Sequence, residues 1–218
     1  MKTKVKWGVI GVAGIATEKV IPAMQRGEWS EVVAIASRNV ERAEQAAEQL
    51  GIGKAYGSYE ELLADPDIEA IYNPLPNHLH VPWSIKAAEA GKHVLCEKPI
   101  SLTVKEARSL LEARDRTGVK IGEAFMVRTH PQWRKVLELI AAGRIGAVQS
   151  VIGYFSYNNR DPKNIRNILQ YGGRRADGYW LLSYLYVSTR LWRRTRPSVR
   201  AGPVRSGHTN GFHDLRNA

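Results

Sequence analysis

An oppositely charged pair, Glu97-Lys98, stands between an apolar run, His93 to Cys96, and Pro99. The apolar run is typical of a buried parallel strand, and a proline directly after the pair ends that strand. Charged side chains are costly in a buried layer unless they face a crevice or each other. Doubly wound α/β proteins carry their chemistry at the carboxyl ends of the strands, which makes Lys98 the first catalytic candidate. The alternative is an ion pair at the surface of a strand end.

A glycine-rich turn near the N-terminus has the residue types that cradle a phosphate. It joins an expected strand, residues 5–10, to an expected helix, residues 17–26, and consists of Gly11, Val12, Ala13, Gly14, Ile15 and Ala16. The first glycine permits a tight turn, the small residues at 13 and 14 let backbone amides approach a pyrophosphate, and Ala16 lets the helix pack on the strand. The strict three-glycine fingerprint is not met, so the predicted dinucleotide site depends on this strand-turn-helix context.

The end of the second expected strand, residues 32–36, predicts which dinucleotide binds. Ser37 and Arg38 follow it, at roughly the offset of 20 residues where an acidic side chain binds the 2′-hydroxyl of NAD. No acidic residue stands there. A hydroxyl and a guanidinium can bind and neutralise a 2′-phosphate, which favours NADP over NAD. The alternative is that Arg38 is a solvated residue ahead of the helix expected over residues 40–50.

The rest of the first 124 residues alternates between strand and helix. The hydrophobic patterns predict helices over residues 59–64, 82–90 and 104–117, and strands over residues 68–72, 93–96 and 120–124. This alternation predicts an α/β fold with a doubly wound parallel sheet of the Rossmann type. The segment from Asn73 to His80 contains two prolines, which stiffen a loop at the carboxyl end of a strand, the side on which ligands bind.

Four separated motifs occur in a fixed order: the glycine-rich turn, the loop 73–80, Glu97-Lys98-Pro99, and Phe125-Met126-Val127-Arg128-Thr129-His130-Pro131. With these motifs, residues 4 to about 173 resemble the Gfo/Idh/MocA oxidoreductases, the family of glucose–fructose oxidoreductase and inositol dehydrogenase. The resemblance is closest to the branch with dihydrodiol dehydrogenase and NADP-dependent xylose dehydrogenase. It implies a Rossmann domain, a second α/β domain built on an open sheet, and homo-oligomers of the full-length proteins.

The resemblance also implies the activity and the roles of individual residues. The family transfers hydride between nicotinamide and a carbon of a sugar or cyclic alcohol. By resemblance Lys98 hydrogen-bonds the reacting oxygen, Glu97 and the loop 73–80 line the nicotinamide side, and Arg128 flanks the cofactor or substrate. The expected cofactor contacts are Gly11, Val12, Ala13, Gly14, Ile15, Ala16, Ser37, Arg38, Pro74, Leu75, Asn77, His80, Glu97, Lys98 and Arg128.

The sequence divides into three parts. Residues 1–124 form the expected dinucleotide-binding Rossmann domain. Residues 125–173 begin the substrate and oligomerisation domain, with a helix expected over 131–142 and a strand over 148–157. Residues 174–218 contain no Lys, Glu, Gln, Ile, Met or Cys and no sustained hydrophobic period, so we expect an incomplete second domain followed by an irregular, largely unstructured tail.

A shift of the reading frame by one nucleotide after Gly173, whether in the gene or as a sequencing error, would account for the change in composition. The family continues from such a glycine pair with Ala-Leu-Met-Asp-Ile-Gly-Cys-Tyr-Pro, and the codons of residues 174–184 permit that segment when read one base later. The codons of residues 191–197 permit a second family-like segment in the same offset. By resemblance the lost segment carries an aspartate and a His or Tyr that acts as general acid/base. We therefore predict impaired activity and loss of the family's oligomer interface.

Composition argues against several other classes of protein. A lone Cys96 excludes an intramolecular disulfide and fits a reducing, cytoplasmic location. No segment approaches the ~18 apolar residues of a membrane span, and the first residues lack a signal-peptide pattern. His78, His80 and His130 share no ligand spacing with a carboxylate or thiol, so we expect no metal.

The net charge of +11 lies mostly in the tail. Residues 174–218 carry nine arginines and two aspartates, whereas residues 1–173 carry 23 basic and 19 acidic side chains. Because nothing in the tail resembles a folded nucleic-acid reader, we do not expect a nucleic-acid partner. The sequence predicts an NAD(P)-dependent oxidoreductase acting on a sugar-like or cyclic alcohol. The alternative is a dinucleotide-binding module without catalysis.

Overall fold

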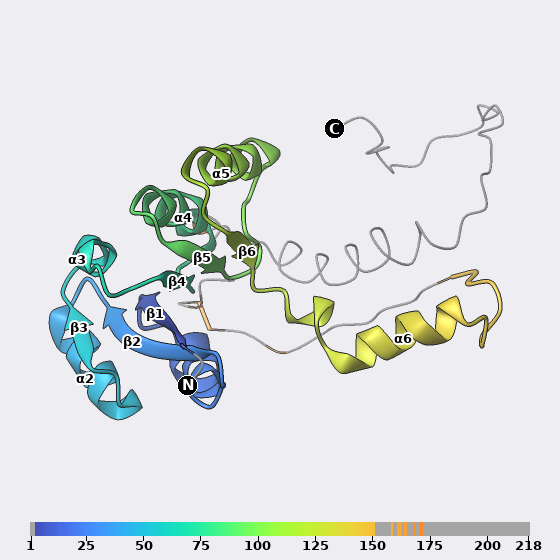
Figure 1. Cartoon of the computed structure of the whole chain (residues 1–218), viewed down its shortest axis with the longest axis horizontal. Helices are drawn as coiled ribbons and strands as arrows, with labels where there is room; N and C mark the ends of the chain where they lie inside the picture. The colour runs from blue at the N-terminus through green and yellow to red at the C-terminus, as the bar shows by residue number, and fades with distance from the viewer. Residues whose placement is uncertain are drawn as a thin grey trace.

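The computed structural model describes residues 3–150 together with Asn158, Asp161, Pro162, Asn164, Ile168 and Tyr171. At its centre lies a parallel sheet of six strands in the order β3-β2-β1-β4-β5-β6 (Figure 1). The strands are β1 Val5–Ile10, β2 Ser30–Ala36, β3 Lys54–Tyr56, β4 Ala70–Asn73, β5 His93–Cys96 and β6 Ile121–Glu123. This sheet confirms the predicted Rossmann-type α/β fold.

Helices connect the strands and cover both faces of the sheet. They are a π-helical turn Ala16–Val20 that leads into α1 Ile21–Gln25, then α2 Val40–Leu50, α3 Tyr59–Ala64, α4 His80–Glu89 and α5 Val104–Thr117. Two buried hydrophobic clusters hold the layers together. One joins the sheet to α3 and α4, and the other joins it to α1 and α2. Helices therefore bury apolar side chains on both faces of the sheet.

The strand order reverses between β1 and β4, the two central strands. β1 pairs with β2 on one side and with β4 on the other. The segments that follow β1, β2, β4 and β5 therefore all emerge at the carboxyl edge of the sheet, around the reversal. Open α/β sheets bind their ligands at this position.

The long helices begin and end at residues whose types favour those positions. The Asn39 side chain accepts a hydrogen bond from an amide in the first turn of α2, and Thr103 and Glu106 form a capping box at the start of α5. Both helices end at glycines in the left-handed conformation, Gly51 and Gly118. These local signals explain why α2 and α5 coincide with the ranges predicted from the sequence.

Several elements differ from the prediction: the helix predicted over residues 17–26 consists of the π-helical turn and α1, and β2 starts two residues before its predicted start. β3 was not predicted, because it has only three residues, lies between Gly53 and Gly57, and shows no alternation of apolar and polar side chains. β4 runs from Ala70 and includes Asn73 as its last residue. α4 starts at His80, two residues before the predicted start, so the loop at the carboxyl end of β4 is shorter than expected.

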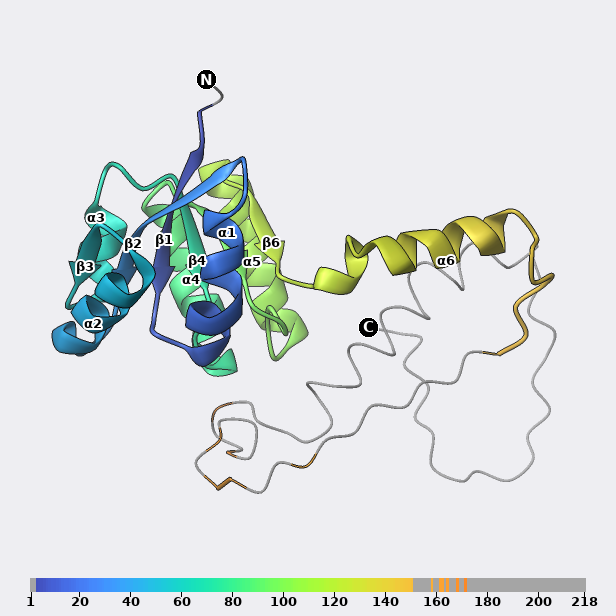
Figure 2. The same ribbon diagram turned by 90° about the horizontal axis from the view of Figure 1, so that it is seen from below.

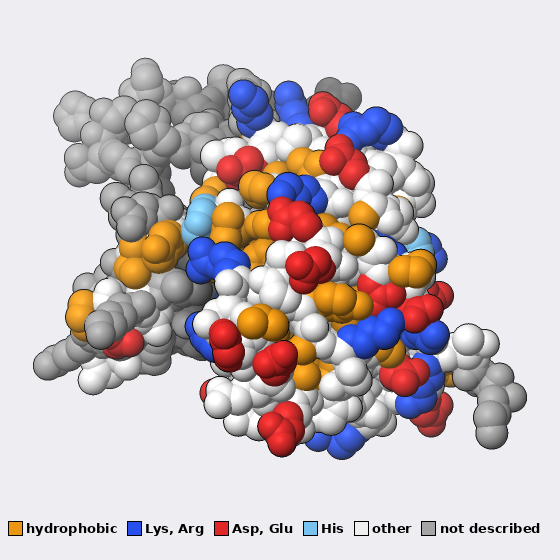
Figure 3. Space-filling model, turned by 90° about the vertical axis from the view of Figure 1, so that its left-hand side faces the viewer, with side chains coloured by type: hydrophobic (Ala, Val, Ile, Leu, Met, Phe, Trp, Pro, Cys, Tyr) orange, Lys and Arg blue, Asp and Glu red, His pale blue; other side chains and the backbone are white. Residues whose placement is uncertain are grey.

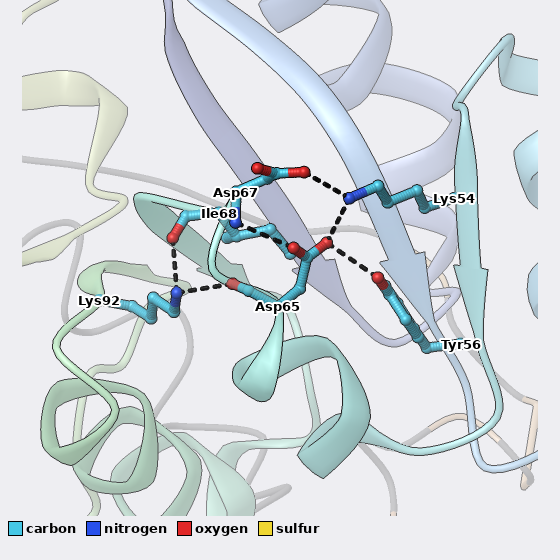
Figure 4. A network of polar contacts seen from close by, with 6 residues as sticks. All are labelled: Lys54, Tyr56, Asp65, Asp67, Ile68 and Lys92. Carbon is cyan, nitrogen blue, oxygen red and sulfur yellow. Dashed lines mark hydrogen bonds and ion pairs between the residues drawn. The ribbon is translucent and has the colours of Figure 1, made fainter.

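A polar network joins β3 to the segments that precede β4 and β5 (Figure 4). The Asp65 carboxylate accepts hydrogen bonds from Lys54 Nζ at 2.9 Å and from Tyr56 Oη at 2.8 Å. The buried Lys92 amine donates to the backbone carbonyls of Asp65 and Ile68, both at 2.7 Å.

After β6 the chain forms a 3-10 turn, Met126–Arg128, and then α6, Pro131–Ala141, which confirms the predicted helix. Figures 1 and 2 both show α6 extending away from the sheet. Of the strand predicted over residues 148–157, residues 148–150 are not in a strand, and the remainder lies outside the described residues. The predicted irregular tail over 174–218 and the frameshift after Gly173 also lie outside the described residues.

The surface of the described part mixes charges of both signs. Figure 3 shows acidic and basic side chains interspersed over the face that it views. This mixture agrees with the near balance of 23 basic and 19 acidic side chains in residues 1–173. Among the helices that the structure describes, none has the length and apolar character needed to cross a membrane.

Candidate active site

The glycine-rich turn leaves β1 at the carboxyl edge and contacts the loop that follows β4. Gly11 has φ +100°, and its amide donates to the Ala36 carbonyl at 2.8 Å. A Cβ on Gly11 would lie 2.8 Å from Leu75 Cδ2, closer than a side chain tolerates. Glycine is therefore required here both for the backbone conformation and for the close approach of the loop.

The turn presents a set of backbone amides ahead of the first helix. The Ala13 carbonyl accepts hydrogen bonds from the amides of Ala16 at 2.9 Å and Thr17 at 3.0 Å, which starts the helix. Ala16 is fully buried, as expected for the position that packs the helix on the strand. Among the described residues, no hydrogen bond uses the amides of residues 12–15. Free amides at a helix N-terminus form a site suited to an anion.

Ser37 and Arg38 follow β2, next to the glycine-rich turn. The Ile10–Ala36 register places the ends of β1 and β2 side by side. Ser37 is buried, and its Oγ accepts a hydrogen bond from the Asn39 amide at 3.3 Å. Arg38 is exposed, and its guanidinium has no hydrogen bond or ion pair with any residue that the structure describes. A cation and a hydroxyl thus lie beside the turn.

Glu97 extends from β5 and is held by β4. Tyr72 Oη donates to Glu97 Oε1 at 2.8 Å, and the Glu97 amide donates to the Asn73 carbonyl at 2.9 Å. The Lys98 amide donates to Glu97 Oε2 at 3.3 Å. Burial raises the pKa of Tyr72, and the charge of Glu97 raises it further, so the phenol remains a protonated donor.

Lys98 is partly exposed at the end of β5, and the bond that follows it, to Pro99, is cis. Its amine makes no hydrogen bond or ion pair with the described residues. The surface ion pair considered as an alternative is therefore absent between Glu97 and Lys98. Cys96, directly before the pair, is fully buried, and burial raises its pKa to about 12. This position agrees with a core residue rather than a nucleophile.

The loop after β4 is held from the inside by two buried polar side chains. Asn73 accepts from the Leu75 amide at 3.2 Å and donates to the His80 carbonyl at 3.1 Å and to Ser84 Oγ at 3.2 Å. The His80 ring is 1% exposed, with Nδ1 2.7 Å from the Pro99 carbonyl oxygen and Nε2 2.6 Å from the Leu75 carbonyl oxygen. His80 thus joins this loop to the segment after Lys98.

His80 therefore faces the interior instead of the carboxyl edge. Burial lowers the pKa of the ring, and the two carbonyl contacts oppose that change by favouring the doubly protonated form. Pro74 and Leu75 are buried, whereas Asn77 is partly exposed on the 3-10 turn Asn77–Leu79. Any contribution of His80 to a bound cofactor would come through the loop that it holds.

The remaining predicted residues lie at the same end of the sheet. Arg128 is exposed in the turn that follows β6. Glu123, the last residue of β6, accepts a hydrogen bond from the Ile100 amide at 3.0 Å, which fixes the segment after the lysine. Within the described part of the chain no group of three or more His, Cys, Asp or Glu residues could hold a metal ion.

Tyr72 and Ser84 support the site, and the sequence did not identify them as site residues, whereas Asn73 was named only as the first residue of the loop 73–80. In the sequence, Tyr72 is indistinguishable from the other apolar residues of a buried strand, and Ser84 from any small residue inside a helix. A signal existed for Asn73, because an amide at the end of an apolar strand and directly before a proline is an unusual choice for a core. No local signal pairs Tyr72 with Glu97, which lies 25 residues later.

Comparison with known proteins gives consistent relatives. An uncharacterized oxidoreductase of Rhizobium meliloti, ORF334, is 58% identical over 169 residues, 78% of this chain and 51% of that protein. D-xylose 1-dehydrogenase (NADP(+)) 2 of Haloferax volcanii is 47% identical over 155 residues, 71% of this chain and 47% of that protein. The chain thus spans about half the length of the curated relatives it matches.

A solved structure and a family model agree with these relatives. The 3-ketoreductase KijD10 from Actinomadura kijaniata, in complex with TDP-benzene and NADP, superposes with a TM-score of 0.62 at 39% identity over 65% of this chain and 44% of that one. The family model described as an oxidoreductase family with an NAD-binding Rossmann fold matches residues 5–125. With more than half of its length matched, the chain belongs to the Gfo/Idh/MocA oxidoreductase family.

Proposed function

We propose that this chain binds NADP(H) at the carboxyl edge of its sheet and serves hydride transfer between nicotinamide and a sugar-like or cyclic alcohol. The observation that carries the proposal is the convergence of three motifs, after β1, β2 and β5, on one edge of the sheet. The names of relatives support it, since the Haloferax enzyme is named for NADP(+) and D-xylose and KijD10 was solved with NADP.

The turn and the end of β2 fit the adenosine half of NADP. The free amides of residues 12–15 would bind the pyrophosphate, and Gly11 has no side chain to obstruct it. Ser37 and the exposed Arg38 guanidinium would bind the 2′-phosphate, which NAD lacks. NAD remains a possible second cofactor with weaker binding, because it has no group for Arg38 to neutralise.

The ends of β4 and β5 fit the nicotinamide half and the reacting oxygen. Glu97 and the loop over Pro74, Leu75 and Asn77 would line the nicotinamide side, with Arg128 at the flank of the cofactor or substrate. NADP, when bound, accepts hydride from the substrate carbon. The Lys98 amine, which no described carboxylate neutralises, would donate a hydrogen bond to the oxygen on that carbon.

The activity of this particular chain is part of the proposal. The aspartate and the His or Tyr that the family resemblance implies for the rest of the site have no counterpart among the described residues. Hydride transfer requires a positioned substrate as well as a cofactor. We therefore expect reduced turnover and no family-type oligomer from residues 1–218.

A non-catalytic dinucleotide-binding module is the second candidate. It is favoured by two observations: the chain spans about half the length of its curated relatives, and the matched family model covers residues 5–125. The two candidates share the cofactor site and differ in turnover.

Cofactor titration tests the part that both candidates share. Purified chain should bind NADPH more tightly than NADH when followed by nucleotide fluorescence. Arg38→Ala should weaken NADPH binding by about 10-fold, as expected for losing one charge-assisted contact of ~1.5 kcal/mol, and should leave NADH almost unchanged.

Arg108→Ala is the matched control, because Arg108 is exposed like Arg38 and lies on α5, far from the end of β2. It should leave both affinities within about twofold, since a distant exposed charge is screened by solvent and salt. Equal affinity of the unsubstituted chain for NADPH and NADH would contradict the assignment of Arg38 to the 2′-phosphate.

A further inference from the structure

Tyr72 occupies an unusual position for a tyrosine of a central strand. Its register partners are Val9 on β1 and Leu95 on β5, so its ring lies in the middle of the sheet, and the residue is 1% exposed. The ring belongs to the same hydrophobic cluster as Val12 and Ala13 of the glycine-rich turn. One residue therefore contacts the cluster below the turn with its ring and the end of β5 with its hydroxyl.

The hydroxyl of Tyr72 determines where the Glu97 carboxylate lies. Among the described residues, Tyr72 is the only one whose side chain hydrogen-bonds to Glu97, at 2.8 Å. A bond between a phenol and a carboxylate is charge-assisted and is stronger than one between neutral groups. The other oxygen, Oε2, has only the 3.3 Å contact with the neighbouring Lys98 amide. Without the phenol the flexible Glu97 side chain would have no fixed orientation.

The arrangement leaves one carboxylate oxygen free for a ligand. Glu97 is partly exposed, and Oε2 keeps acceptor capacity because a carboxylate oxygen has two lone pairs. A ribose carries two hydroxyl donors, which a fixed carboxylate can accept together. Burial keeps the Tyr72 hydroxyl protonated and blocks any role as an exposed acid or base, so its effect must pass through Glu97.

We propose that Tyr72 is a positioning residue, whose hydroxyl holds the Glu97 carboxylate toward the ribose on the nicotinamide side of the bound dinucleotide. This inference rests on the proposed function, because it requires a dinucleotide at the carboxyl edge. It predicts that loss of the Tyr72 hydroxyl weakens binding of the nicotinamide half of the cofactor and leaves binding of the adenosine half unchanged. The adenosine half is bound after β1 and β2 and does not involve Tyr72, whereas the nicotinamide half depends on it.

The test uses two ligands and the conservative variant Tyr72→Phe, which keeps the ring and removes the hydroxyl. The probes are NADPH and 2′,5′-ADP, which contains the 2′-phosphate half without nicotinamide. Tyr72→Phe should weaken NADPH binding by about 5- to 10-fold and leave 2′,5′-ADP binding within about twofold. A tyrosine that only fills the core would change both affinities together, or neither, and either result would overturn the inference.

Tyr56→Phe is the matched control for Tyr72→Phe. Tyr56 also donates to a carboxylate at 2.8 Å, that of Asp65, and Tyr56→Phe keeps the backbone carbonyl that accepts a hydrogen bond from the Ser37 amide. Loss of the Tyr56 hydroxyl should leave both affinities unchanged. A decrease equal to that of Tyr72→Phe would overturn the inference, because it would show a general response to losing a buried tyrosine bond.

A second variant keeps the test decisive if Tyr72→Phe does not fold. Glu97→Ala should reduce NADPH affinity by a similar factor and spare 2′,5′-ADP, and the double variant Tyr72→Phe, Glu97→Ala should be no weaker than Glu97→Ala alone. Additive losses would mean that the tyrosine acts independently of the glutamate. If the unsubstituted chain bound neither NADPH nor 2′,5′-ADP, both the proposed function and this inference would be wrong. If it bound both probes but Tyr72→Phe weakened them equally, only the inference would be wrong.

Discussion

Glu97 and Lys98 are neighbours in sequence with opposite charge, yet the structure does not pair their side chains. The Glu97 carboxylate is held by Tyr72, and the Lys98 amine makes no ion pair with the described residues. An amine with no protein partner keeps its hydrogen-bonding capacity for a ligand. At the scale of single residues, the two charged groups of the motif therefore act separately. Tyr72 fixes the Glu97 carboxylate from inside the sheet, and the Lys98 amine lies unpaired, among the described residues, at the end of β5.

Asp65 makes stability depend on pH in a defined direction. Hydrogen bonds from Lys54, from the Asp67 amide and from Tyr56 lower the pKa of Asp65 from 3.8 to about 2. A carboxyl with a lowered pKa in the folded state adds stability above its unfolded pKa and loses it as pH falls through the folded value. We expect the wild-type chain to lose stability from about pH 4 to pH 2, and Asp65→Asn to lose less over that range.

Urea unfolding at pH 7 and at pH 3 measures this effect. At pH 7, Asp65→Asn should cost on the order of 1–2 kcal/mol, since Asp65 is buried but Lys54 is 40% exposed and screened by solvent. Glu60→Gln, which removes the exposed ion pair with Lys86, is the control and should cost less than about 0.5 kcal/mol. An equal pH dependence in wild-type chain and Asp65→Asn would contradict the role of Asp65.

At the scale of elements, most strands could be predicted from the sequence, because each is a short apolar run followed by a residue type that ends a strand. A glycine follows β1 and a charged pair follows β5, so the carboxyl ends of both strands could be predicted. β3 could not, because three residues between two glycines carry no periodicity. The Tyr72–Glu97 bond could not either, since it depends on the register between β4 and β5.

His80 illustrates the same limit for side-chain direction. Its place in a loop at the carboxyl end of β4 made it a candidate for contact with the cofactor. A sequence does not reveal whether a ring faces the ligand or the interior, because that depends on where the Pro99 and Leu75 carbonyls lie. Its role in the cofactor site stays a prediction, now as a link between two segments.

Replacing His80 should therefore affect the loop first. His80→Asn shortens the side chain and leaves at least one of the two buried carbonyls without a donor, which should cost about 1–3 kcal/mol of stability. NADPH affinity should fall with it, because the loop and the segment after Lys98 would no longer be joined. Thermal unfolding and NADPH titration of the same samples measure both effects.

His93→Asn is the matched control for His80→Asn. His93 is exposed at the start of β5, and its Nδ1 accepts a single hydrogen bond, from the Lys120 amide at 3.1 Å. It should cost less than about 0.5 kcal/mol and leave affinity unchanged. If both histidine variants behaved alike, the two carbonyl contacts of His80 would have no special importance.

At the scale of the whole molecule, the described sheet holds the groups expected for a cofactor, whereas the substrate residues implied by the family fall in the segment after Gly173. We predict that purified residues 1–218 show no NADP-dependent oxidation of aldoses, inositols or dihydrodiols. A chain whose reading frame is shifted by one nucleotide after Gly173 should oxidise at least one of them. Absorbance of NADPH measures turnover.

NADPH titration of both chains serves as the control for this comparison. Both should bind the cofactor with similar affinity, so that a difference in turnover reports the substrate site and not the Rossmann domain. Equal turnover by the two chains would contradict the predicted frameshift and would mean that the substrate site is complete within residues 1–218.

The position of β1 has a consequence for how the chain is made. A ribosome releases the glycine-rich turn among the first residues, but β1 gains its second neighbour only when β4, Ala70–Asn73, has emerged, and Leu75 meets Gly11 later still. During synthesis the glycine-rich turn is therefore present for a long interval before β4 and Leu75, which contact β1 and Gly11, have been made. A dinucleotide bound as proposed, between the ends of β1 and β5, would therefore stabilise the sheet only after β1 has paired with both of its neighbours.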